Sequence, residues 1–196
     1  MASNTLNFVT SNPGKIAALQ NRLGNKVKVK QILLDIPEIQ ADTAEEIALY
    51  KARYAYEQTG EPLIMQDSAF HIRALNGFPG PYIKFVNETI GTEGLLSLMQ
   101  NKEDRYCYFE LVTVYIDKIG KEHTFKNSDT KGGTIAIKRH DLNNSKSWSV
   151  LWQVYIPSWA KEPLAALSKE QIDKHEQEND KESDMYNFAQ WYKAQS

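Results

Sequence analysis

One segment constrains the fold of this chain more than any other: a short apolar strand that ends at an acid and leads into a turn-rich loop. Residues 63–65 (LIM) are typical of a buried strand, and Asp67 closes it. Residues 76–81 (NGFPGP) then predict a rigid loop, and Lys84 follows it. Ligands of α/β folds bind beyond the ends of strands, so this acid and this lysine suit a site for a metal ion and a phosphate.

Strand-like and helix-like segments interleave along the whole chain, which predicts an α/β fold in a single domain over residues 1–196. The charged stretch 168–184 predicts a solvated helix or a loop. Further strands are expected over 6–10, 27–34, 106–116, 123–125, 133–138 and 149–156, and helices over 16–23, 43–56, 92–100, near 164–167 and over 185–192.

Charge and cysteine content exclude several classes of protein. Lys and Arg total 23 against 25 Asp and Glu, a net charge of -2, which offers no basic surface for a nucleic-acid polymer or a membrane. The single cysteine, Cys107, excludes an internal disulfide and is expected to be a buried strand residue rather than a nucleophile. Without a signal-like N-terminus or an 18-residue apolar run, the chain is expected to be cytoplasmic.

Residues 10–15 (TSNPGK) form the first candidate binding segment. A strand runs into a short polar loop that opens a helix, where free backbone N–H groups favour an anion. Ser11 and Asn12 add polar side chains, and Lys15 adds a positive charge on the first turn. An ordinary capped helix start explains the same residues equally well.

Two acids and three lysines complete the candidate site. Glu38 and Asp67 offer the oxygen ligands that Mg²⁺ takes together with substrate phosphates. Lys15, Lys51 and Lys84 would supply the cations that a triphosphate needs. Taken alone, Glu38 also suits a surface loop and Lys51 a surface lysine whose stem packs on the helix.

Other kinds of site lack their patterns. The four histidines are scattered without the spacing of metal ligands, and no glycine-rich dinucleotide fingerprint or nucleophile elbow occurs. The histidines are His71, His123, His140 and His175.

The order of these motifs resembles the inosine triphosphate pyrophosphatase family, whose members hydrolyse deaminated purine nucleoside triphosphates to monophosphate and pyrophosphate. Residues 8–15 (FVTSNPGK) resemble the family's Thr/Ser-Gly-Asn-x-x-Lys loop. Residues 35–40 (DIPEIQ) are similar to its Leu-Pro-Glu segment, and residues 74–84 (ALNGFPGPYIK) to its most specific signature. The resemblance covers residues 7–117 well and decays beyond them.

This resemblance implies a fold and a role for each residue. The implied fold is an elongated two-lobed α/β protein with a long twisted mixed sheet, flanking helices and a central cleft, commonly in a homodimer. Mg²⁺ would be the cofactor, held by Glu38 and Asp67, and Asp67 would also activate the water that attacks the α-phosphorus. Lys15, Lys51 and Lys84 would act in catalysis. Contacts to the nucleoside triphosphate substrate are expected from Thr10, Ser11, Asn12, Lys15, Lys51, Ser68, Lys84 and Trp152.

The chain departs from the family pattern at four places. The family's later Lys-Asn and Ser-His-Arg elements, which read the purine oxygen, have no clear counterpart in residues 168–184. Gln66 stands where the family has the first of two consecutive acids, and Ser11 replaces a glycine. Residues 149–155 (SVLWQVY) lack the Asp and Pro of the family's base-clasping loop. Aromatic residues offer a stacking surface for a base, although core packing explains each of them as well. They are Trp148, Trp152, Tyr155 and Trp159.

Two alternatives therefore stay open beside hydrolysis of deaminated purines. The first is a non-catalytic nucleotide-binding or interaction module on the same fold. The second is a pyrophosphatase that acts on pyrimidine or modified nucleotides.

Overall fold

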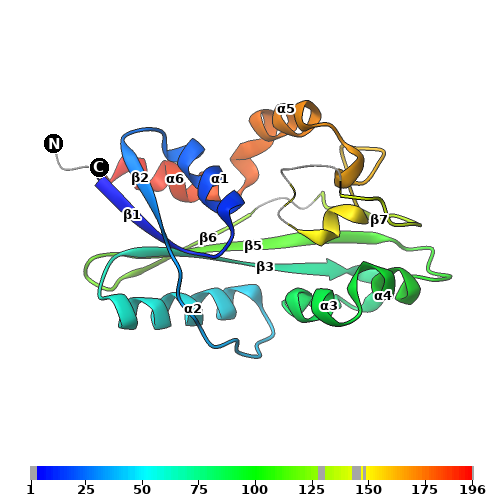
Figure 1. Cartoon of the computed structure of the whole chain (residues 1–196), viewed down its shortest axis with the longest axis horizontal. Coiled ribbons are helices and arrows are strands. Elements are labelled where there is room, and N and C mark those ends of the chain that lie inside the picture. The colour runs from blue at the N-terminus through cyan, green and yellow to red at the C-terminus, as the bar shows by residue number, and fades with distance from the viewer. Residues whose placement is uncertain (1–3, 128–130, 143–146, 148, 196) are drawn as a thin grey trace. The chain divides into compact units, whose positions relative to one another are not determined.

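A computed structural model describes residues 4–127, 131–142, 147 and 149–195 (Figure 1). The chain folds into two compact units, each made of segments that are not contiguous in the sequence. The first unit comprises Met1–Ser68, Leu111–Ser128 and Lys181–Ser196, and the second comprises Ala69–Glu110 and Asp129–Asp180. Two long strands, β3 (Leu63–Ile72) and β5 (Tyr106–Ile116), contribute residues to both units.

The first unit is built on a mixed sheet. β1 (Asn4–Val9) pairs in parallel with β2 (Val27–Ile32) and with β3, and β5 pairs in antiparallel fashion with β6 (Glu122–Lys126). Parallel strands need helical crossovers, and the chain supplies them between β1 and β2 and between β2 and β3. The predicted α/β class is thereby confirmed.

Three helices cover this sheet. α1 (Pro13–Leu23) and α6 (Asp184–Ala194) lie on one side of the strands, and α2 (Ala44–Thr59) lies on the other (Figure 1). The core between the strands, α1 and α6 contains Phe8, Leu19 and Phe188. A capping box between Thr43 and Glu46 begins α2, as the sequence predicts.

The second unit contains shorter elements. Its sheet pairs the end of β3 with β4 (Pro79–Gly80), and β5 with β7 (Gly133–Ile135), which in turn pairs with β8 (Tyr155–Pro157). Asn76 and Gly77 have positive φ in the turn before β4, which explains why the loop uses these residue types. The helices are α3 (Ile83–Thr89), α4 (Gly91–Leu98) and α5 (Lys169–Asn179), with 3₁₀ turns η1 (Arg73–Leu75), η2 (Val150–Gln153), η3 (Leu164–Ala166) and η4 (Asp180–Glu182), the last shared with the first unit.

Most predicted elements are present. In the first unit, the strand expected to end at Asp67 continues to Ile72. It does so because Ala69, Phe70 and Ile72 extend its buried pattern. Asp67 therefore lies inside β3.

The other main differences fall in the second unit. The strand expected over 149–156 is wrong: Ser149 caps η2 by accepting the Leu151 N–H, and only Tyr155–Pro157 is extended. The sequence does not predict α3. This helix buries only Val86 and has no side-chain cap, so it lacks the apolar stripe and the capping residue that indicate a helix. The charged stretch forms α5.

Cys107 is completely buried in β5, as expected, and burial raises the pKa of its thiol well above the usual range. Among the residues that the structure describes, every helix is too short or too polar to cross a membrane.

Candidate active site

Two acids and a lysine of the first unit meet at one ammonium group. Lys51 on α2 donates to Asp67 Oδ2 with Nζ at 2.7 Å, and its Nζ lies 2.8 Å from Glu38 Oε2. Asp67 belongs to β3, whereas Glu38 lies in the irregular segment between β2 and α2. The structure therefore brings together three of the residues that the sequence singles out.

Lys51 is held as a cation by these two carboxylates. Desolvation, the largest single influence, lowers the pKa of its ammonium, but Asp67 and then Glu38 outweigh it, so the pKa of Lys51 is raised. The Asp67 carboxylate is fixed further by the Ser68 backbone N–H, which donates to Oδ1 at 2.9 Å. Ser68 is thus adjacent to the site through its backbone.

The loop before α1 has the geometry of a capped helix start. Thr10 Oγ1 accepts the Asn12 N–H, and Asn12 Oδ1 accepts the Gly14 N–H at 2.9 Å, with Pro13 in the first position of the helix. Ser11 is exposed. This arrangement directs Lys15 on the first turn toward β3.

Lys15 connects that loop to the middle of β3. Its Nζ donates to the Gln66 carbonyl oxygen at 3.1 Å. Part of the side chain reaches the surface, yet its surroundings are dense enough for desolvation to lower the pKa of the ammonium. The charges of Asp67 and Asp184 act against this lowering, and that of Lys51 adds to it. Lys15 and Lys51 are therefore two neighbouring cations that approach the same strand.

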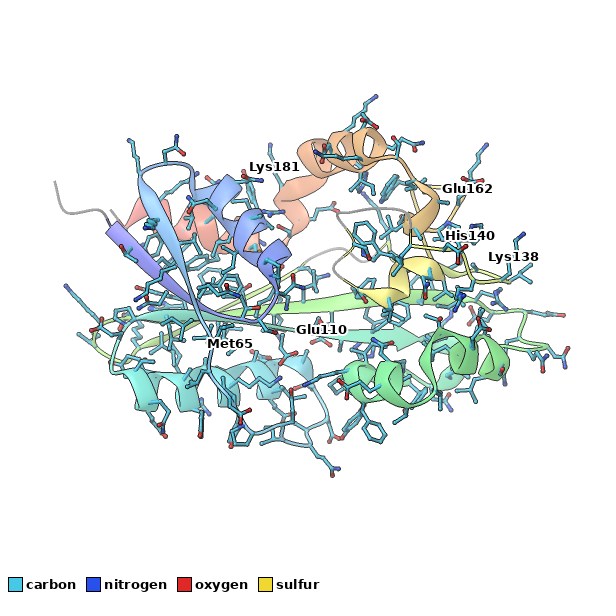
Figure 2. All side chains as sticks on the ribbon, viewed as in Figure 1. Met65, Glu110, Lys138, His140, Glu162 and Lys181 are labelled. Atoms are coloured by element: carbon cyan, nitrogen blue, oxygen red, sulfur yellow. The ribbon has the colours of Figure 1, made fainter. Side chains whose placement is uncertain are left out.

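Sequence reasoning missed Asp184, which lies in the first turn of α6 and is only 1% exposed. Its Oδ2 accepts hydrogen bonds from Gln66 Nε2 and from Thr113 Oγ1, each at 2.6 Å. Figure 2 labels Met65, the residue before Gln66, which marks this part of β3. An acid at position 66 would face the Asp184 carboxylate, whereas a glutamine donates to it, so the departure from the family pattern has a structural reason.

A divalent cation fits the oxygen donors at this site. The described residues include no cluster of three or more His, Cys, Asp or Glu that would hold a metal ion alone. Asp67 and Glu38 nevertheless converge on one cation, the Lys51 ammonium. Two carboxylates with the remaining ligands from phosphates and water suit Mg²⁺.

The other two predicted residues belong to the second unit. Lys84 lies on the first turn of α3 and is exposed, while Trp152 lies in η2 and is only 3% exposed, packed with Ala165, Leu167 and Ile172. A base would find little of the Trp152 ring to stack on. That both residues contact the substrate stays a prediction.

The remaining aromatic candidates differ in exposure. Tyr155 is buried, Trp148 lies outside the described residues, and Trp159 is partly exposed and stacks on His175 with ring centroids 4.0 Å apart. Trp159 and His175 line an open cavity of about 600 Å³, whose rim includes Glu162 (labelled in Figure 2). This cavity contains none of the predicted acids and lysines.

Comparisons with known proteins identify the family of this chain. The model of the Ham1 family matches residues 6–179. A dITP/XTP pyrophosphatase of Methanopyrus kandleri is 35% identical over 187 residues, covering 95% of each chain. An inosine triphosphate pyrophosphatase of Aspergillus fumigatus is 44% identical over 138 residues, which cover 70% of this chain and 73% of that protein.

Solved structures share the fold. The Ham1 protein of Staphylococcus aureus superposes with a TM-score of 0.80 at 23% identity, covering 98% of this chain and all of that one. A HAM1 protein from Coxiella burnetii gives a TM-score of 0.74 at 22% identity, with 95% of this chain and 94% of that chain covered.

Proposed function

This chain belongs to the Ham1 family, and on that premise we propose that it hydrolyses non-standard nucleoside triphosphates, such as ITP and XTP, to the monophosphate and pyrophosphate. Relatives named dITP/XTP pyrophosphatase and inosine triphosphate pyrophosphatase support this activity. The observation that carries the proposal is the meeting of Asp67 and Glu38 at the Lys51 ammonium, beside the Lys15 that approaches from the α1 loop.

In the proposed reaction, Asp67 orients a water molecule and accepts a proton from it as the water oxygen bonds to the α-phosphorus. The bond between the α-phosphorus and the bridging oxygen breaks, and pyrophosphate leaves with its electron pair. Glu38 and Asp67 would hold Mg²⁺, which when bound neutralises phosphate charge and polarises the phosphoryl oxygens.

The lysines neutralise the charge of the triphosphate in this proposal. Lys15, together with Thr10, Ser11 and Asn12 of the loop, binds the phosphate end of the substrate, and Lys51 and Lys84 stabilise the leaving pyrophosphate. Substrate phosphates would then share Lys51 with the two carboxylates that hold it in the free protein.

The test mixes the purified protein with Mg²⁺ and a panel of triphosphates: ITP, dITP, XTP, dUTP, the standard nucleotides and several modified ones. Pyrophosphate release is followed, with Asp67→Asn as the control. We expect release with at least one non-standard nucleotide and a loss of turnover of 1,000-fold or so in Asp67→Asn, the order of magnitude associated with losing a positioned base. Turnover that survives in Asp67→Asn would contradict the role of this residue.

A non-catalytic nucleotide-binding module is the second candidate, and Gln66 at the place of an acid favours it. Such a module would bind nucleotide in both the parent and Asp67→Asn and release pyrophosphate in neither. Retention of both acids at one lysine argues for the enzyme, because binding alone has less need of them.

Altered base selection is the third candidate. Residues 149–155 lack the family's base-clasping pattern, and η2 buries Trp152 there. A preference for dUTP or a modified nucleotide over ITP and XTP in the same panel would support it.

The proposal extends to the cofactor, the assembly and the location. Mg²⁺ is favoured by the all-oxygen donors, a homodimer by the resemblance to the family, and the cytoplasm by the single buried cysteine. Titration with Mg²⁺, Mn²⁺ and Ca²⁺ after chelation tests the first, and sedimentation equilibrium tests the second.

A further inference from the structure

Asp184 is a buried acid whose hydrogen bonds join three elements of the first unit. One carboxylate oxygen, Oδ2, accepts from Gln66 Nε2 on β3 and from Thr113 Oγ1 on β5, both at 2.6 Å, while Asp184 itself begins α6. A carboxylate that is 1% exposed is costly to bury unless such donors compensate it. The position is therefore built for hydrogen bonding rather than tolerated by chance.

Gln66 connects Asp184 to the candidate site, because its side chain binds Asp184 and its backbone binds a lysine of the site. Its carbonyl oxygen accepts Lys15 Nζ at 3.1 Å, and the next residue, Asp67, binds Lys51 Nζ at 2.7 Å. One residue of β3 thus has its side chain held by Asp184, while its carbonyl and its neighbour hold the two lysines. A change in the position of Gln66 would move both.

The electrostatic environment of Lys15 also involves Asp184. Asp184 and Asp67 are the two carboxylates whose field favours the charged form of Lys15 against its desolvation. Asp184 is therefore close enough to the Lys15 ammonium for their charges to interact, although Asp184 lies on α6 and Lys15 on α1.

We infer that Asp184 is a positioning residue of the proposed reaction: by holding the Gln66 side chain, it fixes the part of β3 that carries Asp67 and receives Lys15. This inference rests on the proposed function for its kinetic consequence. Asp184 contacts neither substrate nor metal in this account, and it acts through Gln66.

Two substitutions break the contact from opposite sides. Asp184→Ala removes the acceptor, and Gln66→Met removes the donor while leaving the Asp184–Thr113 hydrogen bond in place. We expect each to lower kcat/KM roughly 10- to 100-fold, the loss that a misplaced catalytic group causes, with kcat affected more than KM. The double variant should lose no more than the worse single variant, since both act on one contact.

Asp184→Asn is the conservative variant. The asparagine carbonyl oxygen can accept from Gln66 and Thr113 as Oδ2 does, so we expect kcat/KM above that of Asp184→Ala, with the remaining loss due to the missing charge near Lys15. Ser183→Ala is the matched control: Ser183 caps the same helix by accepting the Tyr186 N–H at 3.0 Å. Its loss should lower Tm but leave kcat/KM unchanged, because the contact to Gln66 remains.

Hydrogen exchange of the peptide over residues 63–68 separates this inference from the proposed activity. We expect faster exchange there in Asp184→Ala and Gln66→Met than in Ser183→Ala. Exchange at the parent rate in both variants would overturn the inference, as would kinetic losses that multiply in the double variant. If the parent released no pyrophosphate from any nucleotide, the proposed function would fail, and the exchange rates alone would still decide whether Asp184 holds the strand.

Discussion

The predicted site residues of the two units are held in different ways. In the first unit, Asp67, Lys51 and Lys15 each have hydrogen bonds that bring them together at the middle of β3. In the second unit, Lys84 is exposed on a short helix, and Trp152 is packed in an apolar cluster.

Trp152 and the charged residues of the first unit would perform different chemistry. Charges that handle phosphate must be placed to within fractions of an ångström, so the protein fixes them with other charges and backbone groups. An aromatic side chain that stacks on a base needs an accessible face, and burial of Trp152 leaves little of one. The first unit therefore carries the stronger argument for catalysis.

Among the lysine substitutions, Lys15→Met is expected to have the largest effect. It should lower kcat/KM roughly 100- to 1,000-fold, the range for losing one preorganised charge donor, as measured by pyrophosphate release. It should also raise Tm, because a desolvated ammonium is removed. Lys28→Met, at an exposed position of β2, is the control and should change neither quantity.

The pH dependence of this stabilisation has a defined sign. The pKa of Lys15 is lowered from 10.5 in the folded chain, so the folded state disfavours its proton. The resulting cost is fully present below the folded pKa and disappears as the pH rises toward 10.5. The difference in Tm between Lys15→Met and the parent should therefore shrink at alkaline pH, and a constant difference would contradict the assigned cause.

Lys51→Met is expected to have the next largest effect on kcat/KM. It should lower stability, whereas Lys15→Met should raise it. Without the ammonium, the Glu38 and Asp67 carboxylates lose the cation between them, so both Tm and kcat/KM should fall, the latter roughly 10- to 100-fold. Thermal unfolding and kinetics at pH 7 measure both. A variant that is as stable as the parent would show that the two ion pairs contribute little.

The pH dependence of the contribution of Lys51 to stability also has a defined sign. The pKa of Lys51 is raised above 10.5 in the folded chain, so its contribution to stability is fully present below that unfolded value. It is lost as the pH rises through the higher folded pKa. The gap in Tm between the parent and Lys51→Met should persist through neutral pH and close only in strong alkali.

The first unit could largely be predicted because its motifs are local. A Pro-Gly-Lys helix start and a Thr-x-x-Glu capping box each place a side chain by rules that act over a few residues. The strand end predicted at Asp67 is wrong, because the apolar residues beyond it continue β3 to Ile72. The meeting of Lys51 with Asp67 then follows from two elements whose order the sequence reveals.

Asp184 could not be predicted in this way. It lies 118 positions after Gln66, and an acid in the first turn of a helix is already explained by the helix dipole. The strand prediction over residues 149–156 failed for another reason. A short apolar run fits a strand or a buried turn equally well, and only the Ser149 cap decides between them.

In the second unit, Trp152→Phe tests whether burial excludes a substrate role. We expect a loss of about 1–2 kcal/mol in the free energy of unfolding, measured in urea, with KM unchanged. Ile172→Val in the same cluster is the matched control and should cost about 0.5–1.5 kcal/mol. A rise in KM for Trp152→Phe alone would show that the ring contacts the base and would remove this distinction between the units.

Lys84→Ala should have the smallest effect. Lys84 is exposed, so salt screens its charge, and we expect kcat/KM to fall about 2- to 10-fold at low salt and less at high salt. Lys102→Ala, at another exposed position of the same unit, should leave kcat/KM unchanged. A loss near that of Lys15→Met would mean that Lys84 is held as firmly in the substrate complex as Lys15 is in the free protein. Residues of both units would then be needed for the phosphate chemistry, and the conclusion that the first unit alone carries it would be wrong.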